Sequence, residues 1–144
     1  AGKMNQGAYA KEFQTLIRER AWCEHIGFIN REQLKVRLKS AAFLALPTRE
    51  DNCPMVVLEA MAAGVPVLAS AIGGVPDLIQ DGVNGLLCDP ARPETFRTAV
   101  ARLLDDRVFA ARLATEAKSQ AQRRFHPLVI AREHLRIYGE VLAG

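Results

Sequence analysis

The chain has 144 residues, a length typical of one domain, so two complete domains are excluded from this chain. Hydrophobic residues make up 49% and charged residues 24% of the sequence, a globular composition that excludes disorder as the overall state. Lysine and arginine number 19 against 16 aspartates and glutamates, and the net charge of +3 is too small to indicate nucleic-acid binding. We therefore expect a globular protein without a nucleic-acid partner.

The number of cysteines and the absence of a long apolar run predict a cytoplasmic protein. The three cysteines, Cys23, Cys53 and Cys88, form no Cys-x-x-Cys pair, and their odd number argues against a disulfide framework. Reduced thiols in the cytoplasm fit this pattern. No apolar run approaches the roughly 20 residues of a membrane-spanning helix. Because the sequence begins with Ala1-Gly2 rather than a methionine, we expect a fragment of a longer cytoplasmic protein.

The first part of the chain alternates helical patterns with short apolar runs. Apolar residues at helical spacing predict helices over residues 8–21 and 31–42. Short apolar runs predict strands at residues 23–29, 43–47, 66–69 and 85–88, each short enough to be buried on both faces.

Proline and glycine mark the remaining helices. One helix begins at Pro54 and ends at Gly64, because proline suits the first helical position and glycine the position after the last. Further helices begin at Pro76 and Pro93, and two more follow residue 106, separated near Pro127. This alternation predicts an α/β fold, a Rossmann-like parallel sheet with right-handed crossovers and flanking helices.

The loops at the carboxyl ends of the strands form the candidate site, because open parallel sheets bind ligands there. Residues 48–53 form a polar, acidic loop that leads into the helix beginning at Pro54. The amino-terminus of a helix presents free N–H groups and a partial positive charge, which suit a phosphate.

Glu59 lies inside this otherwise apolar helix, where a buried carboxylate without a partner would be destabilising. Two interpretations stay open. Glu59 faces the surface, or it accepts hydrogen bonds from the two hydroxyls of a ribose.

Two glycine-containing turns follow. Gly73-Gly74 precedes the helix at Pro76, and the lack of side chains would let a ligand approach the backbone there, although such turns are also common without a function. Residues 81–85, Asp-Gly-Val-Asn-Gly, are a turn signal before a strand, and a structural role is favoured for them.

The helix over residues 31–40 is basic, with Arg31, Lys35, Arg37 and Lys39 against Glu32. A solvated face is favoured, and contact with an acidic membrane surface is the alternative. The three histidines lack metal-ligand spacing, and no Walker or Rossmann glycine fingerprint is present. We expect no metal and no other cofactor.

Residues 47–90 combine several signals in a fixed order. Asp51 and Glu59 bracket seven residues, and an Ala-rich turn with glycine, a Pro-Val strand, a Gly-Gly-x-Pro turn and an Asp-Gly-x-Asn-Gly turn follow. In this the chain resembles the donor-binding, carboxy-terminal domain of retaining glycosyltransferases of the GT-B fold, family 4 (glycosyl transferases group 1). Weaker similarity extends over most of the chain.

The resemblance implies a hexosyltransferase of polysaccharide biosynthesis that moves a hexose from a nucleotide diphosphate sugar to a glycan or lipid acceptor with retention. Asp51, or the adjacent Glu50, would be the catalytic carboxylate that contacts the donor sugar. Glu59 would bind the ribose, and the diphosphate would lie near the backbone of Asn52, Cys53, Pro54, Met55, Gly73 and Gly74. The helix dipole and basic side chains would stabilise the leaving diphosphate without a metal.

The resemblance further implies that residues 1–144 are a partial nucleotide-sugar-binding domain, in which 106–144 form a helical carboxy-terminal extension. The amino-terminal acceptor domain and the first strands of the donor domain would be missing, so the chain alone would be inactive. We expect the resulting gap in the sheet to close by rearrangement or by pairing with a second copy. The whole protein would be cytoplasmic, or peripheral at the inner membrane face.

A different class of function stays open beside this one. A shortened relative could keep the two carboxylates for structure only, as a non-catalytic α/β nucleotide-binding or assembly module.

Overall fold

The computed structural model describes residues 7–144 and divides into two compact units, with the boundary between Arg37 and Leu38. The first unit contains helix α1 (Ala8–Arg18) and most of helix α2 (Arg31–Ser40). α2 begins with a reciprocal capping box. The backbone N–H of Gln33 donates to Asn30 Oδ1 and the backbone N–H of Asn30 donates to Gln33 Oε1, each at 2.9 Å.

The basic side chains of α2 are partly neutralised by neighbours within the first unit. Lys35 Nζ lies 2.8 Å from Glu32 Oε1, and Arg37 Nη1 lies 3.5 Å from Glu24 Oε2. These pairs fit the solvated-face interpretation of α2, and contact with a membrane surface stays a prediction. Within residues 7–144, no helix combines the length and the hydropathy needed to cross a bilayer.

The predicted strand at residues 23–29 is wrong, because this segment has no regular secondary structure. A strand needs a hydrogen-bonded neighbour, and among the described residues this apolar run pairs with none. The large side chains here are also poorly packed, since Trp22, just before the segment, is 83% exposed and Phe28, within it, is 77% exposed. The described sheet therefore has three strands instead of the four that the sequence predicts.

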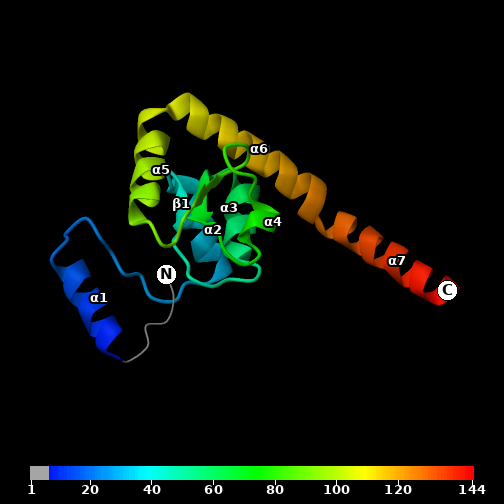
Figure 1. The fold of residues 1–144 in the computed structure, drawn as a ribbon, viewed down its shortest axis with the longest axis horizontal. Helices are drawn as coiled ribbons and strands as arrows, with labels where there is room; N and C mark the ends of the chain where they lie inside the picture. The colour runs from blue at the N-terminus through cyan, green and yellow to red at the C-terminus, as the bar shows by residue number, and fades with distance from the viewer. Residues whose placement is uncertain (1–6) are drawn as a thin grey trace. The chain divides into compact units, whose positions relative to one another are not determined.

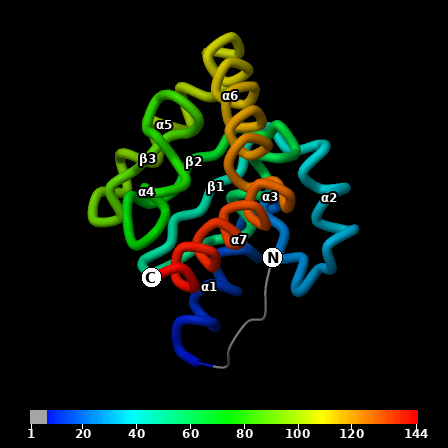
Figure 2. Tube along the Cα trace, turned by 90° about the vertical axis from the view of Figure 1, so that its right-hand side faces the viewer, coloured from blue at the N-terminus to red at the C-terminus, as the bar shows by residue number. Residues whose placement is uncertain are grey.

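The second unit is built on that sheet, which consists of β1 (Leu44–Leu46), β2 (Val67–Ser70) and β3 (Leu86–Cys88). All pairs are parallel and the order is β1-β2-β3, which confirms three of the predicted strands and the α/β class (Figure 2). β2 is central and all four of its residues are buried. β1 is an edge strand among the described residues, and pairing of this edge with another chain stays a prediction.

Helices connect and cover these strands as the proline and glycine signals predict. α3 (Met55–Ala63) begins one residue later than predicted, because Pro54 is extended and takes the N-cap position rather than the first helical position. Gly64 caps the other end, and its φ of 73° is a left-handed conformation that glycine adopts without strain. The chain continues through α4 (Val75–Leu78), α5 (Pro93–Asp105), α6 (Arg107–Phe125) and α7 (Pro127–Ala143), drawn from green to red in Figure 1.

The core of the second unit joins the sheet to α5 and α6. One apolar cluster contains seven buried residues, namely Leu68, Leu86, Cys88, Leu103, Phe109, Ala110 and Leu113. α6 also packs along α3 (Figures 1 and 2). It contributes five buried residues, whereas α7 contributes none. Residues 106–144 are thus helical almost throughout, and their assignment as a separate extension stays a prediction.

Candidate functional site

The loops that follow β1 and β2 pack directly against each other. The amide of Gly74 donates a hydrogen bond to the carbonyl oxygen of Asp51 at 3.1 Å. A Cβ on Gly73 would lie 2.2 Å from that carbonyl oxygen, and a Cβ on Gly74 would lie 1.8 Å from the carbonyl oxygen of Asn52. Both glycines are therefore required by the approach of the chain's own backbone. The sequence alone, which suggests an approaching ligand, does not predict this contact.

The acidic part of the β1 loop is held by a turn at Thr48. The Thr48 hydroxyl donates to the Glu50 carbonyl oxygen at 2.8 Å and accepts a hydrogen bond from the Glu50 amide at 3.3 Å. The Glu50 side chain is exposed, whereas Asp51 is half-buried beside the glycine turn. The two candidate catalytic carboxylates thus have different surroundings, and Asp51 is the one attached to the packed junction of the loops.

The amino-terminus of α3 is open toward this junction. Pro54, which is buried, precedes the first helical residue, no side chain caps the helix, and its first turn contains no acidic residue. The first N–H groups of a helix lack the usual partner four residues back, and here the Val57 N–H donates to the Pro54 carbonyl oxygen at 2.9 Å. The partial positive charge of this end of α3 suits an anion. Asn52, Cys53 and Met55 surround this end with exposed side chains.

Glu59 lies one turn into α3 and is half-buried. Its neighbours Val57 and Ala60 are completely buried, so Glu59 lies at the margin of the buried face of the helix. This position agrees with a carboxylate that a ligand reaches from the surface. It leaves the ribose contact and the simple surface position both open.

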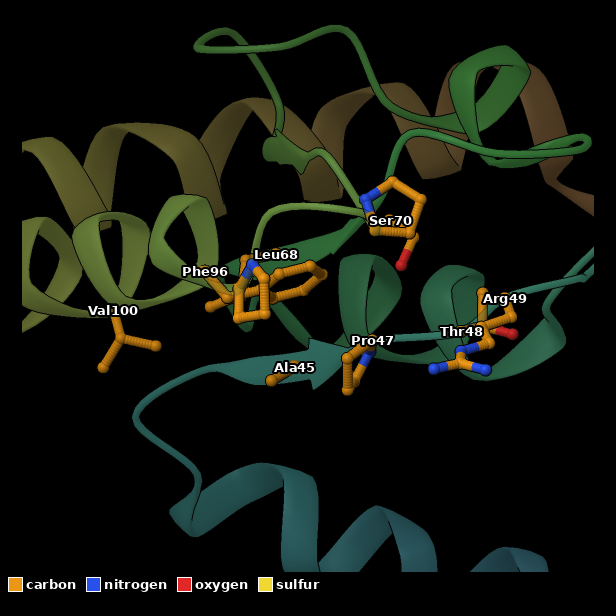
Figure 3. Close-up of a pocket in the computed structure, with 10 residues that line it drawn as sticks. Ala45, Pro47, Thr48, Arg49, Leu68, Ser70, Phe96 and Val100 are labelled. Atoms are coloured by element: carbon orange, nitrogen blue, oxygen red, sulfur yellow. The ribbon is translucent and has the colours of Figure 1, made fainter.

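A pocket of about 360 Å³ lies next to the same loop, at the carboxyl ends of β1 and β2 and beside α5 (Figure 3). Its lining is mostly apolar and includes Ala45, Pro47, Leu68, Phe96 and Val100, with Thr48, Arg49 and Ser70 as polar members.

Ser70 is the polar residue that sequence analysis did not single out. Its side chain is fully buried at the end of β2, and its hydroxyl has no hydrogen-bond partner in the described chain. A buried hydroxyl of this kind is unusual in a folded protein. The sequence contains one signal for it, a serine at the end of a wholly apolar strand.

The thiols and the acidic groups show no metal centre. Within residues 7–144, no group of three or more His, Cys, Asp or Glu side chains could hold a metal ion. All three cysteines are free; Cys53 is exposed and Cys88 is buried. Burial, and then the nearby charge of Asp81, raise the pKa of the Cys88 thiol, which keeps it protonated and unreactive.

Comparison with known proteins gives a consistent result. The family model "Glycosyl transferases group 1" matches residues 1–120. An uncharacterised glycosyltransferase of Methanocaldococcus jannaschii is 34% identical over 113 residues, which are 78% of this chain and 29% of that protein. The D-inositol 3-phosphate glycosyltransferase of a Nocardioides strain is 34% identical over 110 residues, covering 76% of this chain and 24% of that protein. The chain thus spans less than a third of the length of these relatives.

Solved structures share the fold. The sucrose-phosphate synthase of Thermosynechococcus elongatus superposes with a TM-score of 0.84 and 28% identity, covering 95% of this chain and 35% of that one. HepE of Anabaena, crystallised in complex with UDP, gives a TM-score of 0.83 and 25% identity, covering 92% of this chain and 37% of that one.

Proposed function

Because this chain belongs to the glycosyl transferases group 1 family, we propose that it forms the donor side of a retaining hexosyltransferase. The complete protein would transfer a hexose from a nucleoside-diphosphate sugar to a glycan or lipid acceptor. The acceptor would be held by a domain outside this chain, so the chain by itself would bind nucleotide without catalysing transfer.

One observation carries the proposal. The loop with Asp51, the Gly73-Gly74 turn and the uncapped start of α3 meet at the carboxyl ends of β1 and β2. In an open parallel sheet this is the end at which ligands bind. A diphosphate placed there would accept hydrogen bonds from backbone N–H groups and would be stabilised by the dipole of α3. The same interactions would stabilise the negative charge that grows on the leaving diphosphate as the glycosidic bond breaks.

Two carboxylates would bind the two sugar rings of the donor, the ribose and the hexose. Glu59, one turn along α3, would accept hydrogen bonds from the ribose hydroxyls, while Asp51 would accept hydrogen bonds from hydroxyls of the hexose. Glu50 is exposed and attached to the same turn, so it is the alternative partner of the hexose. No residue is assigned as a covalent nucleophile, and the acceptor hydroxyl would attack from the face that the diphosphate leaves.

A solved relative indicates which nucleotide to test. A structural relative with 25% identity, HepE, was crystallised with UDP, which makes a uridine nucleotide the first ligand to test. No metal is part of the proposal, because the helix dipole and backbone donors supply the positive potential that the diphosphate requires.

The test is a titration of the chain with UDP, GDP and ADP, followed by the backbone amide resonances of residues 51–59 and 73–77. Selective shifts with one nucleotide are expected, in the presence of EDTA as well as in its absence. Glu59→Gln should weaken that binding by about 10-fold, the scale of one or two lost hydrogen bonds to a charged group. Glu94→Gln, at an exposed carboxylate in the first turn of α5, is the matched control.

The outcome distinguishes the two classes of function. An unchanged affinity in Glu59→Gln would remove the ribose contact. Nucleotide binding by the chain, combined with the absence of hexose transfer by the complete protein, would support a non-catalytic nucleotide-binding module instead.

A further inference from the structure

The Asp-Gly-Val-Asn-Gly turn at residues 81–85 contains a fully buried polar side chain, Asn84. Its carboxamide oxygen accepts a hydrogen bond from the backbone N–H of Gln80 at 2.7 Å, and its Nδ2 donates to the Leu78 carbonyl oxygen at 3.1 Å. Leu78 is the last residue of α4, the short helix that begins directly after Gly74. Asn84 therefore holds the carboxyl end of the element whose other end is the glycine turn of the candidate site.

The second N–H of the Asn84 amide reaches a different part of the chain. It donates to Gln120 Oε1 on α6 at 2.8 Å, across 36 positions of sequence. Gln120 in turn donates from Nε2 to Glu116 Oε1 at 3.2 Å, and Arg123 donates to the same oxygen at 2.8 Å. The Gln120 side chain is thus oriented from its own helix, with its oxygen toward Asn84.

Two further hydrogen bonds join α6 to the same segment. Arg124 Nη2 donates to the Asp77 carbonyl oxygen in α4 at 3.1 Å, and Arg112 Nη2 donates to the Gly82 carbonyl oxygen at 2.9 Å. Of these three contacts, only the one with Gln120 involves the fully buried side chain of Asn84. Its N–H could not form a hydrogen bond to water if the Gln120 oxygen were removed. Loss of this contact would therefore act on Asn84 more strongly than loss of an exposed one.

We infer that Gln120 is a positioning residue for the diphosphate-binding turn: it acts through Asn84 and α4 to fix Gly73-Gly74 against the backbone of Asp51. The path has three parts. Hydrogen bonds join Asn84 to Gln120 and to Leu78, the backbone of the short helix α4 leads from Leu78 back to Gly74, and a hydrogen bond joins Gly74 to Asp51. α6 also packs along α3, so one helix braces the two elements that would contact the nucleotide. The consequence for nucleotide binding rests on the proposed function, whereas the positioning of the turn does not.

The experiment compares Gln120→Met with Gln122→Met in the full 144-residue chain. Methionine keeps the length of glutamine but removes the acceptor, and Gln122 is an exposed position on the same helix. The first measurement is amide hydrogen exchange at Gly74, whose N–H is bonded to Asp51, relative to Ala69 in the central strand, which reports opening of the core.

Gln120→Met should accelerate exchange at Gly74 by roughly 10-fold relative to Ala69, the effect of one unpaired buried N–H on local opening. Gln122→Met should leave the ratio unchanged. Equal acceleration at both amides, or none at Gly74, would overturn the inference, because Gln120 would then serve only global stability or nothing.

The second measurement is UDP binding by the same variants. We expect an affinity several-fold weaker in Gln120→Met and unchanged in Gln122→Met. Failure of the unmodified chain to bind any nucleotide would refute the proposed function, while the exchange ratio would still decide the positioning role of Gln120.

Discussion

The amide of Gly74 and the carbonyl oxygen of Asp51 are joined by a 3.1 Å hydrogen bond that connects the loops after two neighbouring parallel strands. The backbones of the two loops are in direct contact, so close that a Cβ on either glycine would clash with them. The candidate carboxylate and the candidate phosphate-binding turn are consequently parts of one packed unit.

Replacement of Gly74 by alanine should therefore destabilise the fold. The new Cβ would lie 1.8 Å from the Asn52 carbonyl oxygen, a backbone atom that can yield only if the loop moves. We expect a loss of about 1–3 kcal/mol in the free energy of unfolding, measured by urea denaturation. Gly139→Ala, in α7 with no atom within 4 Å of the new Cβ, is the control and should be neutral or slightly stabilising. Equal stability of the two variants would contradict the packed junction.

Asp51 and Glu50 should be separable by their effects on nucleotide-sugar binding. If Asp51 accepts hydrogen bonds from the hexose, Asp51→Asn should weaken binding of the UDP-hexose about 10-fold and leave the affinity for UDP unchanged. Glu50→Gln, at the exposed neighbour, should change neither affinity. Calorimetric titration of each variant with both ligands checks this. The reverse pattern would identify Glu50 as the carboxylate that contacts the sugar.

The two cysteines of the second unit should differ in reactivity and in protection by nucleotide. Cys53 is exposed next to the start of α3, whereas Cys88 is buried and its pKa is raised by that burial. We expect iodoacetamide to modify Cys53 and to leave Cys88 intact until the chain unfolds. UDP at ten times its dissociation constant should slow the modification of Cys53 by about 10-fold, because most sites would be occupied.

Mass spectrometry of the labelled peptides measures both rates, and Cys88 is the internal control for folding. An unchanged Cys53 rate under saturating UDP would place the diphosphate away from the start of α3.

The connection from β3 to α5 should weaken in acid. The Ala91 amide donates to Asp89 Oδ1 at 2.9 Å and Arg92 Nε donates to Oδ2 at 3.0 Å, and these contacts, the backbone bond first, hold the pKa of Asp89 below its usual value. A lowered pKa means that the unfolded chain binds this proton more readily, so stability is present above about pH 4 and is lost as the pH falls through the folded pKa.

Asp89→Asn should therefore be less stable than the unmodified chain at pH 7 and should approach it toward pH 2–3, as urea midpoints measured across this range would show. Asp105→Asn, at an exposed carboxylate at the end of α5, is the control. A stability difference for Asp89→Asn that is independent of pH would rule out an electrostatic origin.

Local signals in the sequence predict much of this structure. Pro54 and Gly64 bracket α3 because their preferences are properties of single residues, which act wherever they occur. The same is true of the helices that begin near Pro93 and Pro127. The strand predicted at residues 23–29 fails because pairing is not local: an apolar run becomes a strand only beside a partner.

In the candidate site, too, local features can be predicted from the sequence and long-range contacts cannot. Sequence alone selects Asp51, Glu59 and the paired glycines, and the structure brings Asp51 and the glycines into contact. The sequence does not predict the hydrogen bond between Asn84 and Gln120. That contact joins two segments 36 residues apart, and glutamine on a helix is normally a surface residue. Long-range polar contacts of this kind depend on how α6 crosses the rest of the unit.

The packing of α6 along α3 also determines when the chain can fold as it is synthesised. α3 is complete once residue 63 has been added, but the helix that covers it begins only at residue 107. Val57, Ala60 and Met61, which are fully buried in the native structure, therefore lack the cover of α6 during translation of the intervening segment. These apolar residues stay without α6 for this interval, so a chaperone that binds short apolar segments would act before α6 leaves the ribosome.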